Sequence, residues 1–225
     1  MNMPEQKVFL MAQGHMKRLA PVLSFPKHHL KIGSETIIGR TLRLLRERDM
    51  DDVTVIAPDI PAWTEFMKGF PEATMATLSE VSPTVASGVF RTRHLWPQGK
   101  SIVALLGDTV FSQAALDLIL KSEAIYEVYT RTTNPWTKKI WPEYYGLKIR
   151  SDGRPLYEAA ASIHENAGDK HYNIPVVTKR IPQASIVSFD GDWTDDIDFP
   201  EELPNLEILA RLAGEEEEER RKSLK

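Results

Sequence analysis

Short apolar runs recur along the chain and are separated by stretches with a helical pattern. Four runs are rich in β-branched residues and too brief for helices: Val8–Ala12, Val53–Ala57, Ile102–Leu106 and Ile186–Phe189. Runs of this kind are typical of strands that are buried on both faces of a parallel sheet. We therefore predict four interior parallel strands.

The stretches between these strands carry apolar residues at helical spacing. Ile38, Leu42 and Leu45 are spaced i, i+4 and i+7, and a second apolar face, Leu116–Leu120, follows Ser112 as a candidate N-cap. Alternation of strand and helix through about residue 121 predicts a three-layer α/β/α fold around a mostly parallel, doubly wound sheet. Folds of this class bind ligands beyond the carboxyl ends of their strands. The functional loops are therefore expected to follow the first and third predicted strands.

The pattern changes after residue 121. Glu127–Thr130, Tyr144–Arg150 and Pro155–Ala159 have the character of strands separated by turns, which predicts a small antiparallel extension of the sheet. A final helix is predicted from Pro200 to Ala213, with proline in its first turn. The charged segment 215–225 is expected to fray into solvent.

Composition narrows the classes of partner. The 225 residues carry a net charge of −4, without the basic excess of a nucleic-acid binder, so we expect no nucleic acid as a partner. The chain has no cysteine, which excludes disulfides and thiolate nucleophiles. No apolar run is long enough to cross a bilayer, so we expect a soluble, cytoplasmic protein without a membrane partner.

A glycine and several cations follow the first predicted strand. Gly14 would let backbone N–H groups approach phosphate oxygens, because glycine has no Cβ to hold a ligand away. Lys17, Arg18 and Lys27 lie close behind it, and guanidinium and ammonium groups together suit a triphosphate. From these residues alone two interpretations stay open: a phosphate-binding loop, or an ordinary turn with solvated surface charges.

Several segments together resemble the sugar-phosphate nucleotidylyltransferases. The stretch AQGHMKRL (residues 12–19) followed by Pro26-Lys27 is similar to the opening signature of that family. Further on, SPTVAS (residues 82–87), Gly107-Asp108 and DDIDFPEEL (residues 195–203) resemble later family segments in the same order. The resemblance spans about residues 7–210, and its strength lies in co-occurrence, since each motif is short.

This resemblance implies a fold, a domain plan and a set of site residues. The fold would be the GT-A-type nucleotide-binding fold, as one domain over residues 1–214. Its parts would be a nucleotide-binding part at about 7–121, an acceptor-binding part at about 122–199 and a C-terminal helix at about 200–213. Nucleotide contacts would come from Ala12, Gln13, Gly14, His15, Lys17, Arg18, Thr84, Ala86 and Ser87. Acceptor contacts would come from Tyr145, Gly146, Glu158 and Asn173, and catalytic groups from Arg18, Lys27 and Asp108.

The opening loop departs from the family pattern at two positions. Met16 stands where the family has a second glycine, and Lys17 stands where it has a small hydroxyl residue. Three interpretations stay open: Lys17 supplies compensating charge, the site has decayed, or the loop suits another nucleotide or donor.

The acidic residues predict a magnesium site. Asp108 follows an apolar run and a glycine, which places its carboxylate at the carboxyl edge of the sheet. Mg²⁺ prefers oxygen ligands and commonly joins one or two carboxylates to substrate phosphates. From its place in the family-like segment, Asp198 is the predicted second ligand, with Asp196 in reserve. The other interpretation is that Asp195 and Asp196 are solvated in a loop and Asp198 caps the terminal helix.

The activity implied by the resemblance joins a nucleoside triphosphate to a phosphorylated small acceptor. A phosphate oxygen of the acceptor would attack the α-phosphorus in line, and pyrophosphate would leave. An attacking phosphate is already ionised near neutral pH, so no general base is required. Arg18 would hold the pyrophosphate portion, and Lys27 would contact phosphate close to the reacting centre.

Two other functions and one assembly question stay open. A glycosyltransferase of the same fold would need D-x-D at the end of a central strand, where this chain has Asp108-Thr109-Val110. A catalytically silent relative that binds nucleotide or a partner subunit is suggested by Met16. Because proteins of this family often assemble, a homo-oligomer is a further open alternative.

Overall fold

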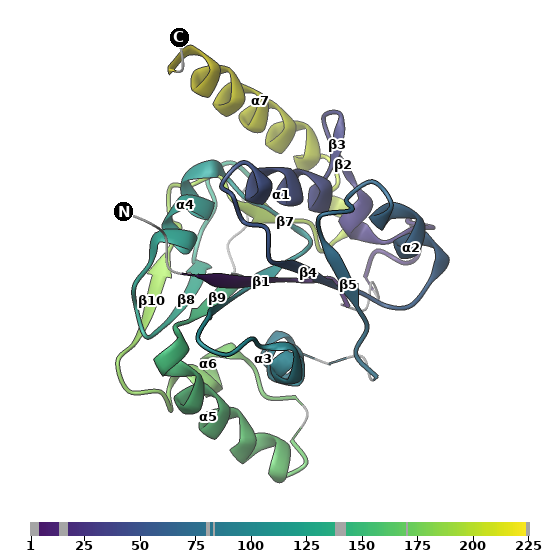
Figure 1. Cartoon of the computed structure of the whole chain (residues 1–225). Helices are drawn as coiled ribbons and strands as arrows, with labels where there is room; N and C mark the ends of the chain where they lie inside the picture. Colours follow the sequence, from purple (N-terminus) through teal and green to yellow (C-terminus); the bar gives the residue numbers. More distant parts are fainter. Residues whose placement is uncertain are drawn as a thin grey trace.

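A seven-stranded sheet forms the centre of the protein (Figure 1). The computed structural model describes residues 5–13, 18–79, 82, 84–137, 143–169 and 171–223. The strand order across the sheet is β10-β8-β9-β6-β1-β4-β5. The strands are β1 (Gln6–Met11), β4 (Val53–Ile56), β5 (Thr74–Ala76), β6 (Ser101–Leu106), β8 (Tyr126–Arg131), β9 (Glu143–Ile149) and β10 (Ala184–Ser188).

Six of these strands run in one direction, and β9 is antiparallel to both of its neighbours, β6 and β8. This arrangement confirms the mostly parallel sheet and its antiparallel extension. Three of the four predicted parallel strands are interior. The fourth, β10, is an edge strand in which Ile186 is 60% exposed. The prediction of an interior position was wrong because the composition of a strand does not show whether it has a neighbouring strand on both sides.

The sheet reverses its winding at β1. This strand lies between β4, which is the next strand of this sheet in the chain, and β6, which begins only after β5. Met11 and Leu106, the last residues of β1 and β6, are in register. The two chain segments that leave these strands start side by side, which is where doubly wound folds place their ligand sites.

Helices cover both faces of the sheet (Figure 1). α1, α2, α4 and α7 lie on one side, and α3, α5 and α6 on the other. Each of the two faces has its own cluster of buried apolar side chains. The helices are α1 (Ile37–Arg46), α2 (Pro61–Met67), α3 (Val85–Arg91), α4 (Gln113–Lys121), α5 (Arg154–Asn166), α6 (Ile174–Thr178) and α7 (Asn205–Ser223). None of the described helices has the length and apolar character needed to cross a bilayer.

Side-chain caps begin three of the helices. Thr36, Thr84 and Ser112 accept a hydrogen bond from the backbone N–H three residues on, at the start of α1, α3 and α4. Each cap satisfies a backbone donor that has no partner within its helix. The predicted cap at Ser112 is thereby confirmed.

Two predictions about helices were wrong. Pro155–Ala159 is part of α5 rather than a strand, because Pro155 lies in the first turn and Tyr157, Ala160 and Ala161 form a buried face at helical spacing. The segment after Ala213 does not fray within the described residues, since α7 continues to Ser223. The predicted final helix is present, but it begins at Asn205, and Pro200 lies in a separate 3₁₀ helix, Pro200–Glu202.

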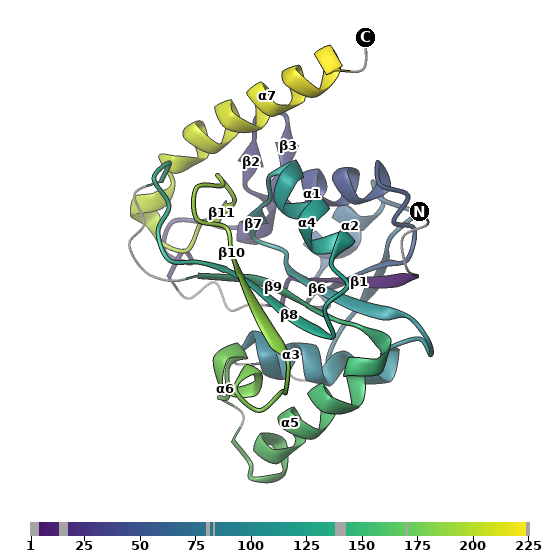
Figure 2. The ribbon, with the colours of Figure 1, turned by 90° about the vertical axis from the view of Figure 1, so that its left-hand side faces the viewer.

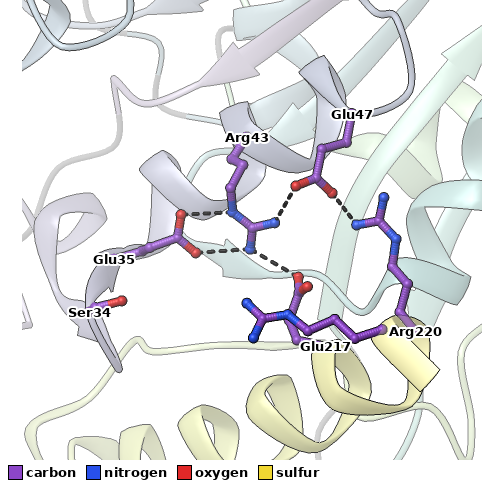
Figure 3. A pocket seen from close by; sticks show the side chains of 7 residues that line it. Ser34, Glu35, Arg43, Glu47, Glu217 and Arg220 are labelled. Carbon is purple, nitrogen blue, oxygen red and sulfur yellow. Dashed lines mark hydrogen bonds and ion pairs between the residues drawn. The ribbon is translucent and has the colours of Figure 1, made fainter. Parts of the chain in front are cut away.

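Ion pairs explain why the charged end of α7 stays helical. Arg43 of α1 pairs with Glu35, Glu47 and Glu217, and Arg220 pairs with Glu47 (Figure 3). These groups border a surface depression of about 530 Å³ between α1 and α7. The network fixes α7 to the body of the protein, because Glu217 and Arg220 of α7 pair with Arg43 and Glu47 at the C-terminal end of α1.

Two short antiparallel pairs complete the fold (Figure 2). β2 (Lys31–Ile32) pairs with β3 (Glu35–Thr36), and β7 (Thr109–Val110) pairs with β11 (Asp195–Asp196). In the second pair Asp196 lies opposite Thr109. This pairing brings the acidic segment near the end of the chain to the residues that follow β6.

Candidate functional site

The site is formed by the segments that leave β1, β6 and β11. Ala12 and Gln13, at the end of β1, are buried. The predicted contacts of Gly14, His15 and Lys17, and the departure at Met16, lie outside the described residues and stay predictions. The description resumes at Arg18.

Lys27 is the buried cation of the site. It lies in a 3₁₀ helix, Lys27–His29, and its side chain is only 10% exposed. Its Nζ forms an ion pair with the Asp108 carboxylate and lies 2.6 Å from Oδ1 of Asp198. The ammonium therefore joins the carboxylate that follows β6 to the one that follows β11.

Arg18 is the exposed cation of the site. Its Nη1 donates a hydrogen bond of 3.1 Å to Oδ2 of Asp198, and its guanidinium lies 4.5 Å from the ring centre of Phe199. The stacking on Phe199 and the bond to Asp198 hold one end of the guanidinium. The side chain is 59% exposed, so it is also accessible to a ligand.

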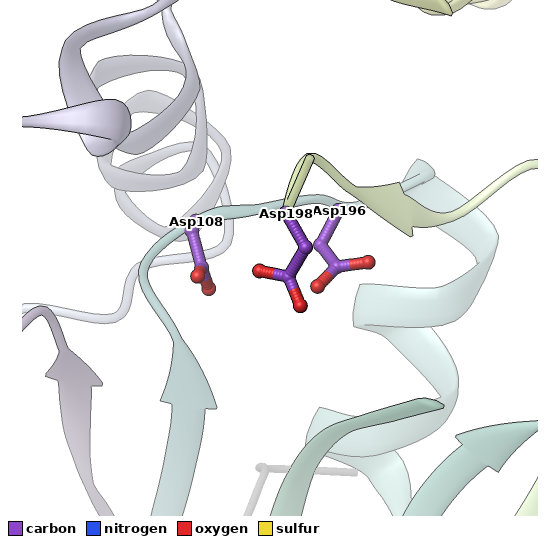
Figure 4. Close-up of side chains that lie close together, drawn as sticks. All are labelled: Asp108, Asp196 and Asp198. Atoms are coloured by element: carbon purple, nitrogen blue, oxygen red, sulfur yellow. The ribbon is translucent and has the colours of Figure 1, made fainter. Parts of the chain in front are cut away.

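Three carboxylates converge beside these cations (Figure 4). One oxygen from each of Asp108, Asp196 and Asp198 lies within 4.8 Å of the others. In an extended segment alternate side chains point to the same side. Asp196 and Asp198 accordingly face Asp108, while Ile197 between them is fully buried in the apolar cluster under α7.

The electrostatics keep Lys27 and Asp108 charged. Burial by itself would lower the pKa of Lys27, but the charges of Asp108 and Asp198 outweigh burial and raise that pKa above its usual value. Burial works to raise the pKa of Asp108, yet Lys27 and then His28 bring that pKa below its usual range. At neutral pH Lys27 is therefore an ammonium group that is paired with an ionised Asp108.

His28 packs against the turn that carries Asp108. It is 2% exposed, and burial lowers its pKa to about 4, so its ring is neutral at neutral pH. A Cβ on Gly107 would lie 3.3 Å from Cδ2 of His28 and 3.2 Å from the carbonyl oxygen of Met11. Glycine at position 107 therefore allows β1, the His28 ring and the Asp108 turn to approach closely.

The predicted nucleotide-base residues belong to the start of α3. Thr84 caps the helix and donates its hydroxyl to the carbonyl oxygen of Tyr172. Ala86 and Ser87 are fully buried, and Ser87 Oγ donates to Glu165 Oε1 at 3.1 Å. These contacts with Tyr172 and Glu165 hold the start of α3 in place. The role of its residues in base selection stays a prediction.

The predicted acceptor residues are spread over three elements. Tyr145 in β9 is fully buried, and its hydroxyl lies 3.3 Å from Asp195. Gly146 is required by the sheet itself, because a Cβ there would lie 2.5 Å from the carbonyl oxygen of Ala104. Glu158 is on α5 and Asn173 is the N-cap residue of α6, on the opposite face of the sheet from β7 (Figure 1). The structure does not bring these last two together with the three carboxylates.

Sequence reasoning gave too little weight to two residues. Asp196 was held in reserve, although the spacing of Asp196 and Asp198 in an extended segment puts both carboxylates on one side. Phe199 was given no role in the predicted site, and it is the surface on which Arg18 stacks. The sequence signal for Asp196 was present, whereas the contact of Phe199 with Arg18 joins distant segments and has no local signal.

Comparison with known proteins establishes the fold. No family model matches the sequence, and neither does any curated protein. Among solved structures, a glucose-1-phosphate thymidylyltransferase candidate from Bacillus anthracis superposes with a TM-score of 0.69 at 15% identity, over 92% of this chain and 95% of that one.

Two further structures agree. A CTP:phosphocholine cytidylyltransferase from Streptococcus pneumoniae gives a TM-score of 0.69 at 12% identity, over 90% of this chain and 98% of that one. An inositol-1-phosphate CTP transferase from T. maritima gives 0.67 at 11% identity, over 92% and 96%. The chain therefore has the nucleotidylyltransferase fold that its sequence resemblance predicted.

Proposed function

We propose that the protein is a nucleotidylyltransferase that joins a nucleoside triphosphate to a phosphorylated small acceptor. One observation carries the proposal: Lys27 and Arg18, from the segment after β1, meet Asp108 and Asp198 at the carboxyl edge of the sheet. Two cations beside a cluster of carboxylates suit a polyphosphate and a divalent ion together. The shared fold with three nucleotidylyltransferases supports the same activity.

The acidic cluster fits a magnesium ion. Its donors are three carboxylates, the hard oxygen ligands that Mg²⁺ prefers. An ion with metal–oxygen bonds of about 2.1 Å joins oxygens up to about 4.2 Å apart, so oxygens within 4.8 Å need only a small closure. Asp108 and Asp198 would hold the ion with Asp196 beside them, and the ion would offset negative charge on the phosphates.

The chain's own residues then have distinct tasks. The acceptor's phosphate oxygen forms a new bond to the α-phosphorus, while the bond from the α-phosphorus to the bridging oxygen breaks and pyrophosphate leaves. Lys27 would contact phosphate oxygens at the reacting centre, and Arg18 would orient the departing pyrophosphate. Catalysis on this plan is positioning and charge neutralisation, with no proton to remove from the nucleophile.

A pyrophosphate-release assay tests the proposal. The protein is incubated with Mg²⁺, each nucleoside triphosphate in turn and a panel of acceptors that includes glucose 1-phosphate, phosphocholine and inositol 1-phosphate. We expect release that requires both substrates and falls by about 100-fold or more in Asp108→Asn, because one charged group at the reacting centre is lost. The matched control, Asp152→Asn, changes an exposed aspartate of a 3₁₀ turn and should keep full activity.

The same assay separates the alternatives. Nucleotide binding without pyrophosphate release for any pair of substrates would contradict the proposal and favour a silent relative. Transfer of a sugar from a nucleotide-sugar donor would contradict it in favour of a glycosyltransferase of the same fold.

A further inference from the structure

A fully buried ion pair lies directly behind the acidic cluster. Arg131, the last residue of β8, and Asp195, the first residue of β11, are both 0% exposed and form an ion pair through Nη2 of the arginine. Arg131 also donates from Nε to the hydroxyl of Tyr145. No role in the proposed reaction has been given to Arg131 or Asp195 so far.

Side chains from three segments meet on the Asp195 carboxylate. Arg131 from β8 and Tyr145 from β9 contact Oδ1, and Thr137 donates its hydroxyl to Oδ2. Close by, Asn134 donates from Nδ2 to the carbonyl oxygen of Thr194 at 3.3 Å. The neighbouring strands β8 and β9 of the main sheet thus hold the short strand β11 through side chains.

This pair is poorly explained by stability alone. Taking two charges out of water is costly, and apolar residues of similar volume often serve a core as well or better. In addition, Nη1 of Arg131 is buried and has no hydrogen-bond partner among the described residues, which carries a further desolvation cost. Such a pair does fix the position of the two strands that carry it, since few other arrangements of the strands would leave both buried charges paired.

The position that needs defining is the register of β11. Its ladder with β7 has only two residue pairs, Asp195 with Val110 and Asp196 with Thr109. A slip by one residue would exchange the two sides of the strand. Asp196 and Asp198 would then turn away from Asp108, and Asp195 and Ile197 would take their places.

We propose that Arg131, Asp195 and Tyr145 are positioning residues that fix β11 so that Asp196 and Asp198 face Asp108. In this assignment Asp195 is not a ligand of the cluster, although it belongs to the same acidic segment. The assignment deepens the proposed function and rests on it for its catalytic meaning. The geometric part can be tested without substrate.

Two measurements on the metal-free and the Mn²⁺-titrated protein test this assignment. Hydrogen exchange reports the protection of amides 109–110 and 195–198, and the signal of free Mn²⁺ reports its affinity. In Asp195→Asn we expect faster exchange in these amides and Mn²⁺ affinity lower by about 10-fold or more, as for loss of groups that orient metal ligands. In Tyr145→Phe, which removes one hydroxyl and keeps the pair, we expect the same changes to a smaller degree.

Tyr126→Phe is the matched control. Tyr126 is also fully buried in the central sheet, and its hydroxyl is hydrogen-bonded to Thr178 on the other face. This variant should lose a buried hydroxyl without changing the exchange of residues 195–198 or the Mn²⁺ affinity. A merely structural role of the pair would instead lower the unfolding temperature in all variants and leave the affinity of the folded protein unchanged.

The outcomes are distinguishable. If Asp195→Asn and Tyr145→Phe fold and show wild-type exchange and Mn²⁺ affinity, the positioning role is overturned. If Asp195→Asn does not fold, Tyr145→Phe decides on the same two readouts. If wild-type protein binds no Mn²⁺ and Asp108→Asn is no different, the magnesium site of the proposed function fails, and the exchange data alone decide whether the pair fixes β11.

Discussion

Lys27 is the buried positive charge that the carboxylates of the site surround. Its ammonium touches two of the three clustered carboxylates, and its pKa is raised by them. The position that it occupies between Asp108 and Asp198 is also one that a divalent cation would favour. Binding of Mg²⁺ to the substrate-free protein should therefore compete with Lys27 for the same oxygens.

The variant Lys27→Met tests this competition. Without Mg²⁺ its unfolding temperature should fall, because the carboxylates are left facing one another. Adding Mg²⁺ should raise the unfolding temperature of the variant more than that of the wild type, since the ion then replaces the missing positive charge. Thermal unfolding with and without Mg²⁺ checks both effects.

Lys7→Met is the control for Lys27→Met. Lys7 is a largely buried lysine paired with Asp52, and it lies near the amino end of β1 instead of the carboxyl end. Its replacement should lower stability without changing the response to Mg²⁺. An equal or smaller Mg²⁺ response in Lys27→Met than in wild type would contradict the competition.

Local sequence patterns predicted only part of the site, and the family resemblance supplied a further residue. The position of Asp108 at the sheet edge followed from the apolar run and the glycine before it. The choice of Asp198 required the family resemblance, because no local pattern shows that residue 198 returns to residue 108. The pairing of Lys27 with both carboxylates depends on the packed tertiary structure and was not predicted.

Among the elements, α4 is held at its end by a buried lysine. Lys148 of β9 is 1% exposed, and its Nζ donates to the carbonyl oxygens of Leu120 at 2.7 Å and Ile119 at 3.2 Å. These carbonyls belong to the last turn of α4, where they have no partner within the helix. Burial lowers the pKa of Lys148 from 10.5 to about 8.

Lys148 should make stability depend on alkaline pH. Between about pH 8 and 10.5 the unfolded chain binds a proton at this lysine that the folded protein has lost. The contribution of Lys148 to the free energy of unfolding therefore rises with pH in this window, by roughly 3 kcal/mol at about 1.4 kcal/mol per pKa unit.

Denaturant unfolding of wild type and Lys148→Met at several pH values isolates this contribution. The advantage of wild type over the variant should grow from pH 8 to pH 10. Five buried tyrosines with raised pKa values act in the opposite direction from about pH 10 upward, where the unfolded chain loses their protons: Tyr126, Tyr129, Tyr145, Tyr157 and Tyr172. A difference that is constant over pH 8 to 10 would contradict the lowered pKa of Lys148.

The charged end of α7 is expected to serve stability and not the reaction. Glu216 pairs with the buried Arg40 and accepts from the backbone N–H of Gln113 at the start of α4. Removing residues 215–225 leaves Arg40 without this carboxylate, which should cost about 1–3 kcal/mol. Transferase activity below the unfolding transition should stay within about 2-fold of wild type, because the segment contacts none of the proposed catalytic residues in the described structure.

Glu216→Gln tests whether the loss of the Glu216 carboxylate, and not the loss of the helical segment, lowers the unfolding free energy of the truncated protein. It removes one charge and keeps the helix, so it should reproduce most of the loss in unfolding free energy. Loss of activity in a folded truncated protein would contradict the assignment of this segment to stability.

The two wrong element predictions have the same physical origin. The apolar residues of Pro155–Ala159 fit a short strand as well as a helix, and the helix is decided by the burial of Tyr157, Ala160 and Ala161 on a face with α3 and α6. The length of α7 is decided by arginines of α1 that are remote in sequence. In both cases tertiary contacts outweighed local preference.

On the scale of the whole molecule, the alternation of strands and helices predicted the fold. The place where the winding of the sheet reverses determines where the site lies. β1 and β6 end side by side, and β11 returns the end of the chain to that point through its ladder with β7. The alternation was visible in the sequence. The return of β11 was not, because a two-residue strand has no distinctive pattern.

Phosphorus NMR of a complete reaction tests the central claim most directly. The protein is given Mg²⁺, a nucleoside triphosphate and a phosphorylated acceptor, and the phosphorus signals of substrates and products are followed together. The account predicts pyrophosphate and a new diphosphodiester in equal amounts, with both signals lost in Asp108→Asn. A folded, nucleotide-binding protein that yields no diphosphodiester with any pair, or that releases only orthophosphate, would contradict it.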